Sequence, residues 1–143
     1  MATDKLNTKL GEWWEIMGNL KPDSPQQDWD EFTSYLNPNA VVYLSGMGAP
    51  PAKGVDEAVA EMKKILGFWG IVERKVLSQG TDAAGKTAFC NMNNRLAILG
   101  EEIDFAETEV AVFDHEDRIL DYKLYCDPAP IMAIFQKKTA AAV

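Results

Sequence analysis

The chain has 143 residues, of which 47% are hydrophobic and 25% are charged, as is usual for a soluble globular protein. Its net charge of −8, with no basic cluster, argues against nucleic acid and against an anionic membrane as partners. The N-terminus lacks the apolar core of a signal peptide, no apolar run is long enough to span a membrane, and the two cysteines lack metal-ligand spacing. We therefore expect one cytoplasmic domain over residues 1–143, with no metal and no organic cofactor.

The N-terminal third predicts two helices. The apolar residues of the first recur with helical spacing: Leu6, Leu10, Trp13, Met17 and Leu20. After the turn KPDSP, Ser24 and Pro25 suit the N-cap and first position of a second helix, which Asn37-Pro38 should end. Both helices are amphipathic, so each needs a partner surface to cover its apolar side.

The remainder predicts a strand at 40–45, a Gly/Pro-rich loop at 46–54 and a third helix from Val55 to Leu66. Further strands are predicted at 70–79, 86–99, 102–113 and 118–126. Asp127-Pro128 should start a short last helix, followed by a disordered tail over about residues 136–143. Helices followed by antiparallel strands form an α+β pattern, in which helices cover one face of a curved sheet and leave room for a pocket.

Five segments carry a family resemblance: YLNPNAVVYL, Gly54 before VDEAVAEM, FAETEVAVF, the hairpin HEDRI, and the closing LDYKLYCDPAP. With them, about residues 5–135 resemble the NTF2-like superfamily, in particular its SnoaL-like polyketide cyclases and limonene-epoxide-hydrolase-type members. The resemblance implies a cone-shaped, mostly antiparallel sheet closed by the N-terminal helices around an apolar pocket, the cystatin-like α+β barrel. It also implies a homodimer and a hydrophobic small molecule as substrate or ligand. The fold hosts many chemistries and many non-enzymes.

Asn94 is the polar exception on one face of the strand at 86–99. Strand residues alternate between faces, and that face is otherwise apolar: Ala88, Cys90, Met92, Leu96 and Ile98. We expect it to face the pocket, with Asn94 either a structural amide or a ligand-binding one. By the family match, the ionisable residues of the epoxide hydrolases fall at Met92, Asn94 and Leu124, so epoxide opening by that mechanism is not expected.

Glu107 and Glu109 share one face of the strand FAETEVAVF. Periodicity alone does not choose which face is buried, but the resemblance implies that both glutamates point inward. Two carboxylates in an apolar pocket raise each other's pKa, so that one is protonated while the other is ionised. Such a pair is the arrangement needed for general acid–base catalysis.

The remaining candidates for the pocket are uncharged. The match places Tyr43 and Ser45 of the strand at 40–45 on the pocket side. The inward set of the last strand includes Tyr122 and Leu124, and we expect Trp14 at the pocket mouth. A tyrosine offers one hydroxyl on an apolar body, which suits it either to orient a carbonyl or to fill a core.

Three functions remain open from the sequence. The first is a cofactor-independent isomerase, cyclase or dehydratase (a lyase) of polyketide- or terpenoid-type secondary metabolism, with Glu107 and Glu109 as acid and base. The second is a non-catalytic domain that binds a hydrophobic ligand. The third is a protein–protein module that uses the outer sheet face around Arg95 and Lys123.

Overall fold

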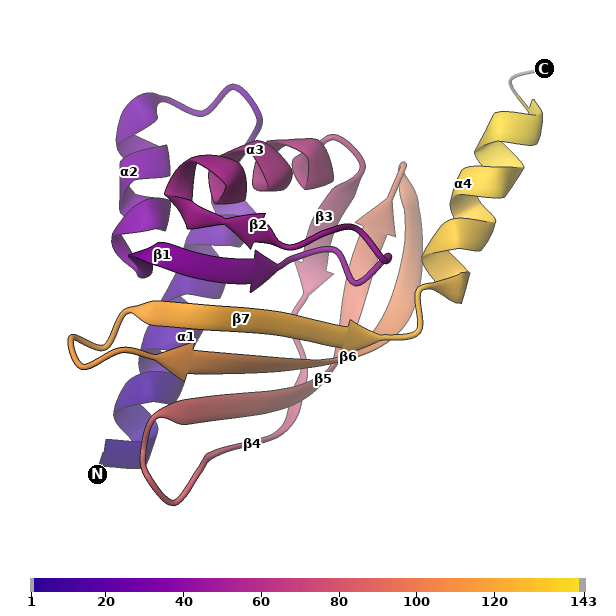
Figure 1. The fold of residues 1–143 in the computed structure, drawn as a ribbon. Coiled ribbons are helices and arrows are strands. Elements are labelled where there is room, and N and C mark those ends of the chain that lie inside the picture. Colours follow the sequence, from indigo (N-terminus) through magenta and orange to yellow (C-terminus); the bar gives the residue numbers. More distant parts are fainter. Residues whose placement is uncertain (1, 142–143) are drawn as a thin grey trace.

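The computed structural model describes residues 2–141, which form a curled sheet with helices around it (Figure 1). The helices are α1 (Ala2–Asn19), α2 (Gln26–Ser34), α3 (Gly54–Leu66) and α4 (Ala129–Ala141). The strands are β1 (Leu36–Tyr43), β2 (Ala52–Lys53), β3 (Trp69–Glu73), β4 (Val76–Thr81), β5 (Thr87–Ile98), β6 (Glu101–Phe113) and β7 (Ile119–Cys126). None of the described helices is both long and apolar enough to cross a membrane.

The sheet has the strand order β2-β1-β7-β6-β5-β3, with β4 also paired to β5. All pairs are antiparallel except β1 with β7, so the predicted α+β class with a curved, mostly antiparallel sheet is confirmed. Register shifts interrupt β3, β4 and the β6–β7 pair. Such bulges bend strands and increase their twist, which helps to curl the sheet around its inner face.

Helix α1 lies behind the sheet, and α2 and α3 lie near β1 (Figure 1). All five residues of the predicted apolar stripe of α1 are buried. Trp13 connects α1 to α2, because its ring stacks on Phe32 at 5.3 Å between centroids and its Nε1 donates to the Phe32 carbonyl at 3.1 Å. The stripe therefore forms the core between the helices and the inner face of the sheet.

The second helix begins and ends differently from the prediction. Ser24 does not cap it; its hydroxyl instead accepts a hydrogen bond from the Lys21 N–H at 2.8 Å and closes the preceding turn. The helix ends at Ser34, and Leu36 to Pro38 already belong to β1, where Pro38 is exposed. A proline is tolerated there because the pairing of β1 with β7 is interrupted between Leu36 and Val41, so its missing N–H costs no ladder hydrogen bond.

The C-terminal helix is longer than predicted. Asp127 accepts a hydrogen bond from the Ala129 N–H at 3.0 Å, in the manner of a cap, and α4 then continues to Ala141. Residues 136–141, predicted as part of a disordered tail, are therefore helical, while residues 142–143 lie outside the described residues. Ile131 and Ile134 are buried, and Phe135 meets Phe68 edge to face at 5.0 Å.

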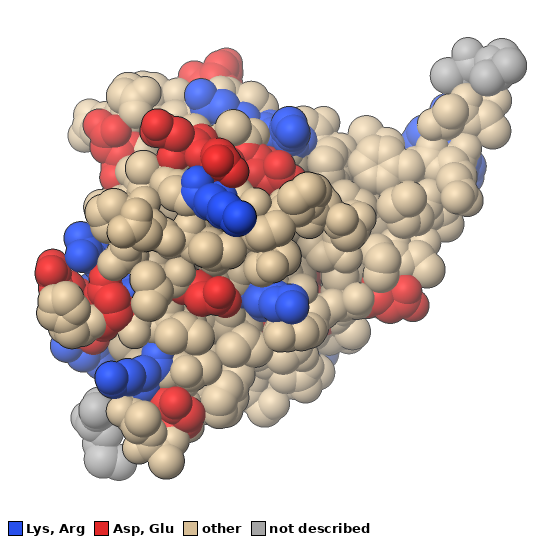
Figure 2. All heavy atoms as spheres, in the orientation of Figure 1, with Lys and Arg blue, Asp and Glu red and all other residues tan. Residues whose placement is uncertain are grey.

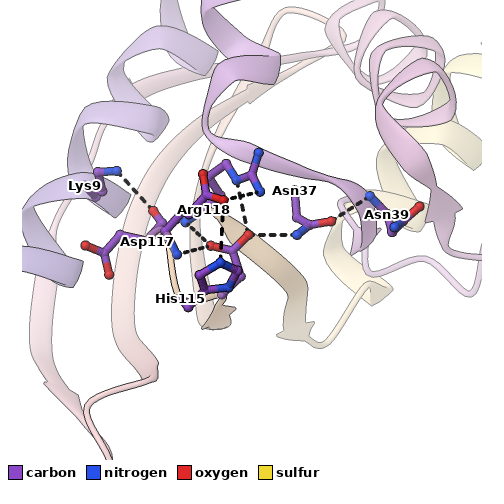
Figure 3. A network of polar contacts seen from close by, with 8 residues as sticks. Lys9, Asn37, Asn39, His115, Asp117 and Arg118 are labelled. Atoms are coloured by element: carbon purple, nitrogen blue, oxygen red, sulfur yellow. Dashed lines mark hydrogen bonds and ion pairs between the residues drawn. The ribbon is translucent and has the colours of Figure 1, made fainter.

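Asp114 organises the turn between β6 and β7. Figure 3 shows the neighbouring turn residues His115, Asp117 and Arg118 beside Asn37 of β1. Asp114 accepts hydrogen bonds from the backbone N–H groups of Glu116 and Arg118 and from Asn37 Nδ2 at 2.7 Å. Burial raises the pKa of Asp114, but these hydrogen bonds and the Arg118 charge outweigh it and hold the pKa below its ordinary value. The contact with Asn37 joins the turn to β1, while the His115 side chain is exposed.

The turn between β5 and β6 supplies a first prediction. Leu99 and Gly100 both have positive φ, 51° and 82°, as a two-residue type I′ turn requires. Asparagine tolerates this conformation better than leucine, whose side chain here is 36% exposed. We expect Leu99→Asn to raise the free energy of unfolding by about 0.5–1 kcal/mol in urea denaturation. Leu99→Ala is the control, since it removes the same side chain but keeps the strain; equal stability of both variants would contradict the prediction.

Candidate active site

A pocket lies between the inner face of the sheet and helices α1, α3 and α4. Its volume is about 590 Å³ with its open mouth included. It is lined by Met17, Leu44, Ser45, Met47, Met62, Ile65, Phe68, Trp69, Arg74, Leu96, Phe105, Glu107, Glu109, Tyr122, Leu124 and Ile131. Figure 2 shows acidic side chains with basic ones among them over α2 and α3, and mostly uncharged atoms around the loop after β1. The pocket is thus an apolar space with three ionised or ionisable groups, Arg74, Glu107 and Glu109, and one phenol.

Glu107 and Glu109 project from β6 into this pocket, with exposed fractions of 8% and 6%. The face they occupy is buried along the strand from Phe105 to Phe113, so the apolar members carry the glutamates inward. Across the ladders, Glu107 lies between Met92 and Cys126, and Glu109 between Cys90 and Leu124. Neither glutamate therefore has a charged neighbour in its own row of the sheet.

The surroundings give the two carboxyl groups different proton affinities. Burial, and next the charge of Glu107, raise the pKa of Glu109 from 4.5 to about 8. Burial also raises the pKa of Glu107, but the hydrogen bond from Asn94 and the charge of Arg74 oppose this rise. Of the two carboxyl groups, Glu109 consequently holds its proton more strongly, and Glu107 is the first to carry the negative charge.

Asn94 lies behind Glu107 and is fully buried. Its Nδ2 donates to Glu107 Oε1 at 2.9 Å, and its Oδ1 accepts from the Lys75 N–H at 2.9 Å. Both ends of the amide are thus satisfied, which explains an asparagine inside a buried strand. Asn94 is not part of the pocket lining, and it acts on the site through Glu107.

Tyr122 and Trp14 support Glu109 from the opposite side. The Trp14 Nε1 donates to the Tyr122 hydroxyl oxygen at 3.0 Å, and the Tyr122 hydroxyl hydrogen-bonds to Glu109. Burial, followed by the charge of Glu109, raises the pKa of Tyr122 well above its ordinary value, so the phenol keeps its proton. The Oε2 atom of Glu109 is buried and has no hydrogen-bond partner, which leaves it available to a ligand.

The other predicted site residues are divided between the pocket and its surroundings. Ser45, Tyr122 and Leu124 line the pocket together with the two glutamates. Met92 is buried behind the lining, and Trp14 is 3% exposed in the core rather than at the mouth.

The expected pocket position of Tyr43 is wrong. On β1 the buried residues are Leu36, Ala40 and Val42, so Tyr43 occupies the outer face, where the Lys123 ammonium lies 5.0 Å from its ring centroid. Helix α3 packs against β1 and covers the Ala40–Val42 side. Ser45 still reaches the pocket because β1 ends at Tyr43 and the alternation ends with it.

Arg74 is the functional candidate that the sequence analysis missed. The predicted strand at 70–79 is in fact two strands, β3 and β4, and Arg74 lies in the break between them and lines the pocket. The only sequence signal is the run Glu73-Arg74-Lys75, which interrupts the strand pattern and does not specify an inward side chain.

Metal and thiol chemistry have no obvious place among the described residues. These residues contain no group of three or more His, Cys, Asp or Glu side chains arranged to hold a metal ion. Both cysteines are free, and burial raises the pKa of Cys90 to about 11, which keeps this thiol protonated.

Comparisons with known proteins identify the fold. No protein-family model matches the sequence, and no curated protein sequence matches it. Among solved structures, a candidate polyketide cyclase from Xanthomonas campestris pv. campestris is 10% identical, with a TM-score of 0.70 over 93% of this chain and 98% of that chain. A steroid delta-isomerase from Pseudomonas aeruginosa is 18% identical, with a TM-score of 0.63 over 96% and 93%. An LEH-like epoxide hydrolase from Mycobacterium tuberculosis is 20% identical, with a TM-score of 0.61 over 94% and 95%. This chain shares the fold of these three structures, which agrees with the cone-shaped NTF2-like fold that the sequence resemblance implied.

Proposed function

We propose that this protein, with its NTF2-like fold, is an enzyme that moves a proton within a hydrophobic small molecule. The observation that carries the proposal is the buried pair of Glu107 and Glu109, two carboxyl groups of different proton affinity in an apolar pocket. Glu107 is the base, because Asn94 and Arg74 favour its charged form. Glu109 is the acid, because burial and the charge of Glu107 favour its protonated form.

The pocket supplies the other requirements of such a reaction. Apolar side chains, among them Leu96 and Phe105, exclude water, which strengthens electrostatic interactions within the site. Tyr122 and Asn94 hold the two carboxyl groups in place without entering the exchange of protons. Isomerisation, cyclisation and dehydration all need a proton taken from one atom and a proton given to another, and this pair provides both steps.

The three solved structures named above support an enzyme, since they are described as a cyclase, an isomerase and a hydrolase. We do not extend epoxide hydrolysis to this chain, because Met92, Asn94 and Leu124 leave no ionisable group at the positions matched to the hydrolases. A polyketide- or terpenoid-type secondary metabolite as substrate, a cytoplasmic location and a homodimer belong to the same proposal. The two free cysteines agree with a reducing compartment.

The proposal is tested by NMR titration of the carboxyl groups in glutamate-labelled protein. We expect Glu109 to titrate with a pKa of about 8. The variant Glu107→Gln should lower that pKa, because it removes the neighbouring negative charge. Two pKa values near the ~4.3 of an exposed glutamate would contradict the acid–base assignment and favour a domain that only binds its ligand.

A further inference from the structure

Arg74 lines the same pocket as Glu107 and Glu109, and it lies in the break between β3 and β4. The Lys75 backbone is fixed on both sides, because its N–H donates to Asn94 and its carbonyl accepts from the Asn93 N–H at 2.9 Å. The preceding residue therefore has a defined position, with its side chain in the pocket lining. The same amide, Asn94, fixes both Lys75 and Glu107, so the cation and the base are positioned by one side chain.

The direct contacts of the Arg74 guanidinium group include no ion pair, although its charge acts on the nearby Glu107 and Glu109. Its Nη1 donates to the Met92 sulfur at 3.4 Å, and its central carbon lies 4.7 Å from the centroid of the Trp14 ring. A thioether is a weak acceptor and an indole is neutral, so neither neutralises the cation. Within the described part of the chain, Arg74 forms no ion pair with a carboxylate.

An arginine has five N–H donors in a planar fork, and here a single weak acceptor uses one of them. Arg95 shows the contrast on the outer face, where it forms ion pairs with both Glu102 and Asp104. The fork of a guanidinium matches a carboxylate, which accepts two parallel hydrogen bonds. An arginine that forms no ion pair, in a pocket whose lining is mostly apolar, is thus complementary to a ligand that combines an apolar body with a carboxylate.

We propose that Arg74 is the anion-binding residue of the pocket, and that the substrate is a hydrophobic molecule carrying a carboxylate group. That the ligand is a substrate rests on the proposed function, but the binding of its carboxylate to Arg74 does not require catalysis. The carboxylate of the ligand pairs with Arg74, its apolar body occupies the space lined by residues such as Phe105, and Glu107 and Glu109 face its reacting atoms. Arg74 in this arrangement selects and orients the substrate.

The test compares phenylacetate with phenylacetamide, which has nearly the same shape but no charge, by isothermal titration calorimetry. We expect the wild-type protein to bind phenylacetate more tightly, and Arg74→Gln to weaken phenylacetate binding by about tenfold to a hundredfold. Binding of phenylacetamide should be the same in both proteins. Arg95→Gln is the matched control and should change neither affinity.

Glu107→Gln should strengthen phenylacetate binding, because it removes a nearby negative charge.

Three results would overturn the inference. The first is that the wild-type protein binds phenylacetate and phenylacetamide with equal affinity. The second is that Arg74→Gln binds phenylacetate as tightly as the wild-type protein does. The third is that Arg74→Gln loses the same factor in affinity for both compounds. The first comparison uses only the wild-type chain, so the test does not depend on how well the variant folds. Arg74→Lys should retain part of the preference, since it keeps the charge but loses the fork. If the preference for phenylacetate is found while Glu109 titrates as an exposed glutamate, the binding inference stands and the catalytic proposal fails.

Discussion

Exchanging Glu107 for glutamine will lower the rate of proton transfer by about 10²–10⁴-fold, the range typical for the loss of a positioned acid or base. Glutamine keeps the shape of the side chain and its contact with Asn94, but it cannot accept a proton as a carboxylate does. The rate is measured as exchange of the α-hydrogens of 2-tetralone, a hydrophobic ketone, for deuterium by NMR. Glu109→Gln should give a loss of similar size, because it removes the acid.

A matched control separates catalysis from stability in this experiment. Glu102 is an exposed glutamate on the same strand, β6, where it pairs with Arg95, so Glu102→Gln should leave the exchange rate unchanged. Binding of 2-tetralone should survive in both pocket variants, since the apolar lining is intact. Exchange at the wild-type rate in Glu107→Gln would contradict its role as the base. Equal losses in Glu102→Gln would show that the effect does not arise in the pocket.

The stability of the wild-type protein will fall as the pH rises from about 4.5 to about 8. The folded state raises the pKa of Glu109 from 4.5 to about 8, so it binds a proton that the unfolded chain releases earlier. This contribution to stability is complete below pH 4.5 and is lost as the pH passes through about 8. The total effect is on the order of a few kcal/mol in the free energy of unfolding. Urea denaturation at a series of pH values measures it.

Glu109→Gln should flatten this dependence, because its amide does not titrate. Glu107, whose pKa is also raised, contributes in the same direction, so a smaller slope should remain. Asp114 acts in the opposite sense: its pKa is lowered from 3.8, and its contribution is lost only at more acidic pH. The two effects are therefore separated by keeping the series above pH 4.5. A variant with the full wild-type slope would show that Glu109 is ionised in the folded protein.

Local patterns in the sequence were sufficient for most of the elements. The stripe from Leu6 to Leu20 predicted α1, because a helix that must bury one side repeats its apolar residues every three to four positions. Alternation likewise placed Glu107 and Glu109 on one face of a strand, and Asn94 on the apolar face of its neighbour. These are relations between residues of a single element, and the geometry of that element alone sets them.

Boundaries set by tertiary contacts were less predictable. The strand predicted at 70–79 is broken because β5 provides hydrogen-bond partners that hold Lys75 out of a regular ladder. Tyr43 was assigned to the wrong face because a strand pattern does not say which side a helix will cover, and α3 covers the other one. Neither β5 nor α3 is part of the segment whose structure it changes, so the pattern of that segment alone does not reveal the change.

The sequence by itself determined the elements, the shared face of the two glutamates and the resemblance to a known fold. Only the tertiary structure decided what surrounds that pair: the approach of Arg74, the amide of Asn94 on Glu107, and Tyr122 supported by Trp14. The physical reason is that periodicity fixes the direction of a side chain relative to its own element. The pKa of a carboxyl group depends instead on burial and on charges from distant parts of the chain, and only the packing of the elements brings these together.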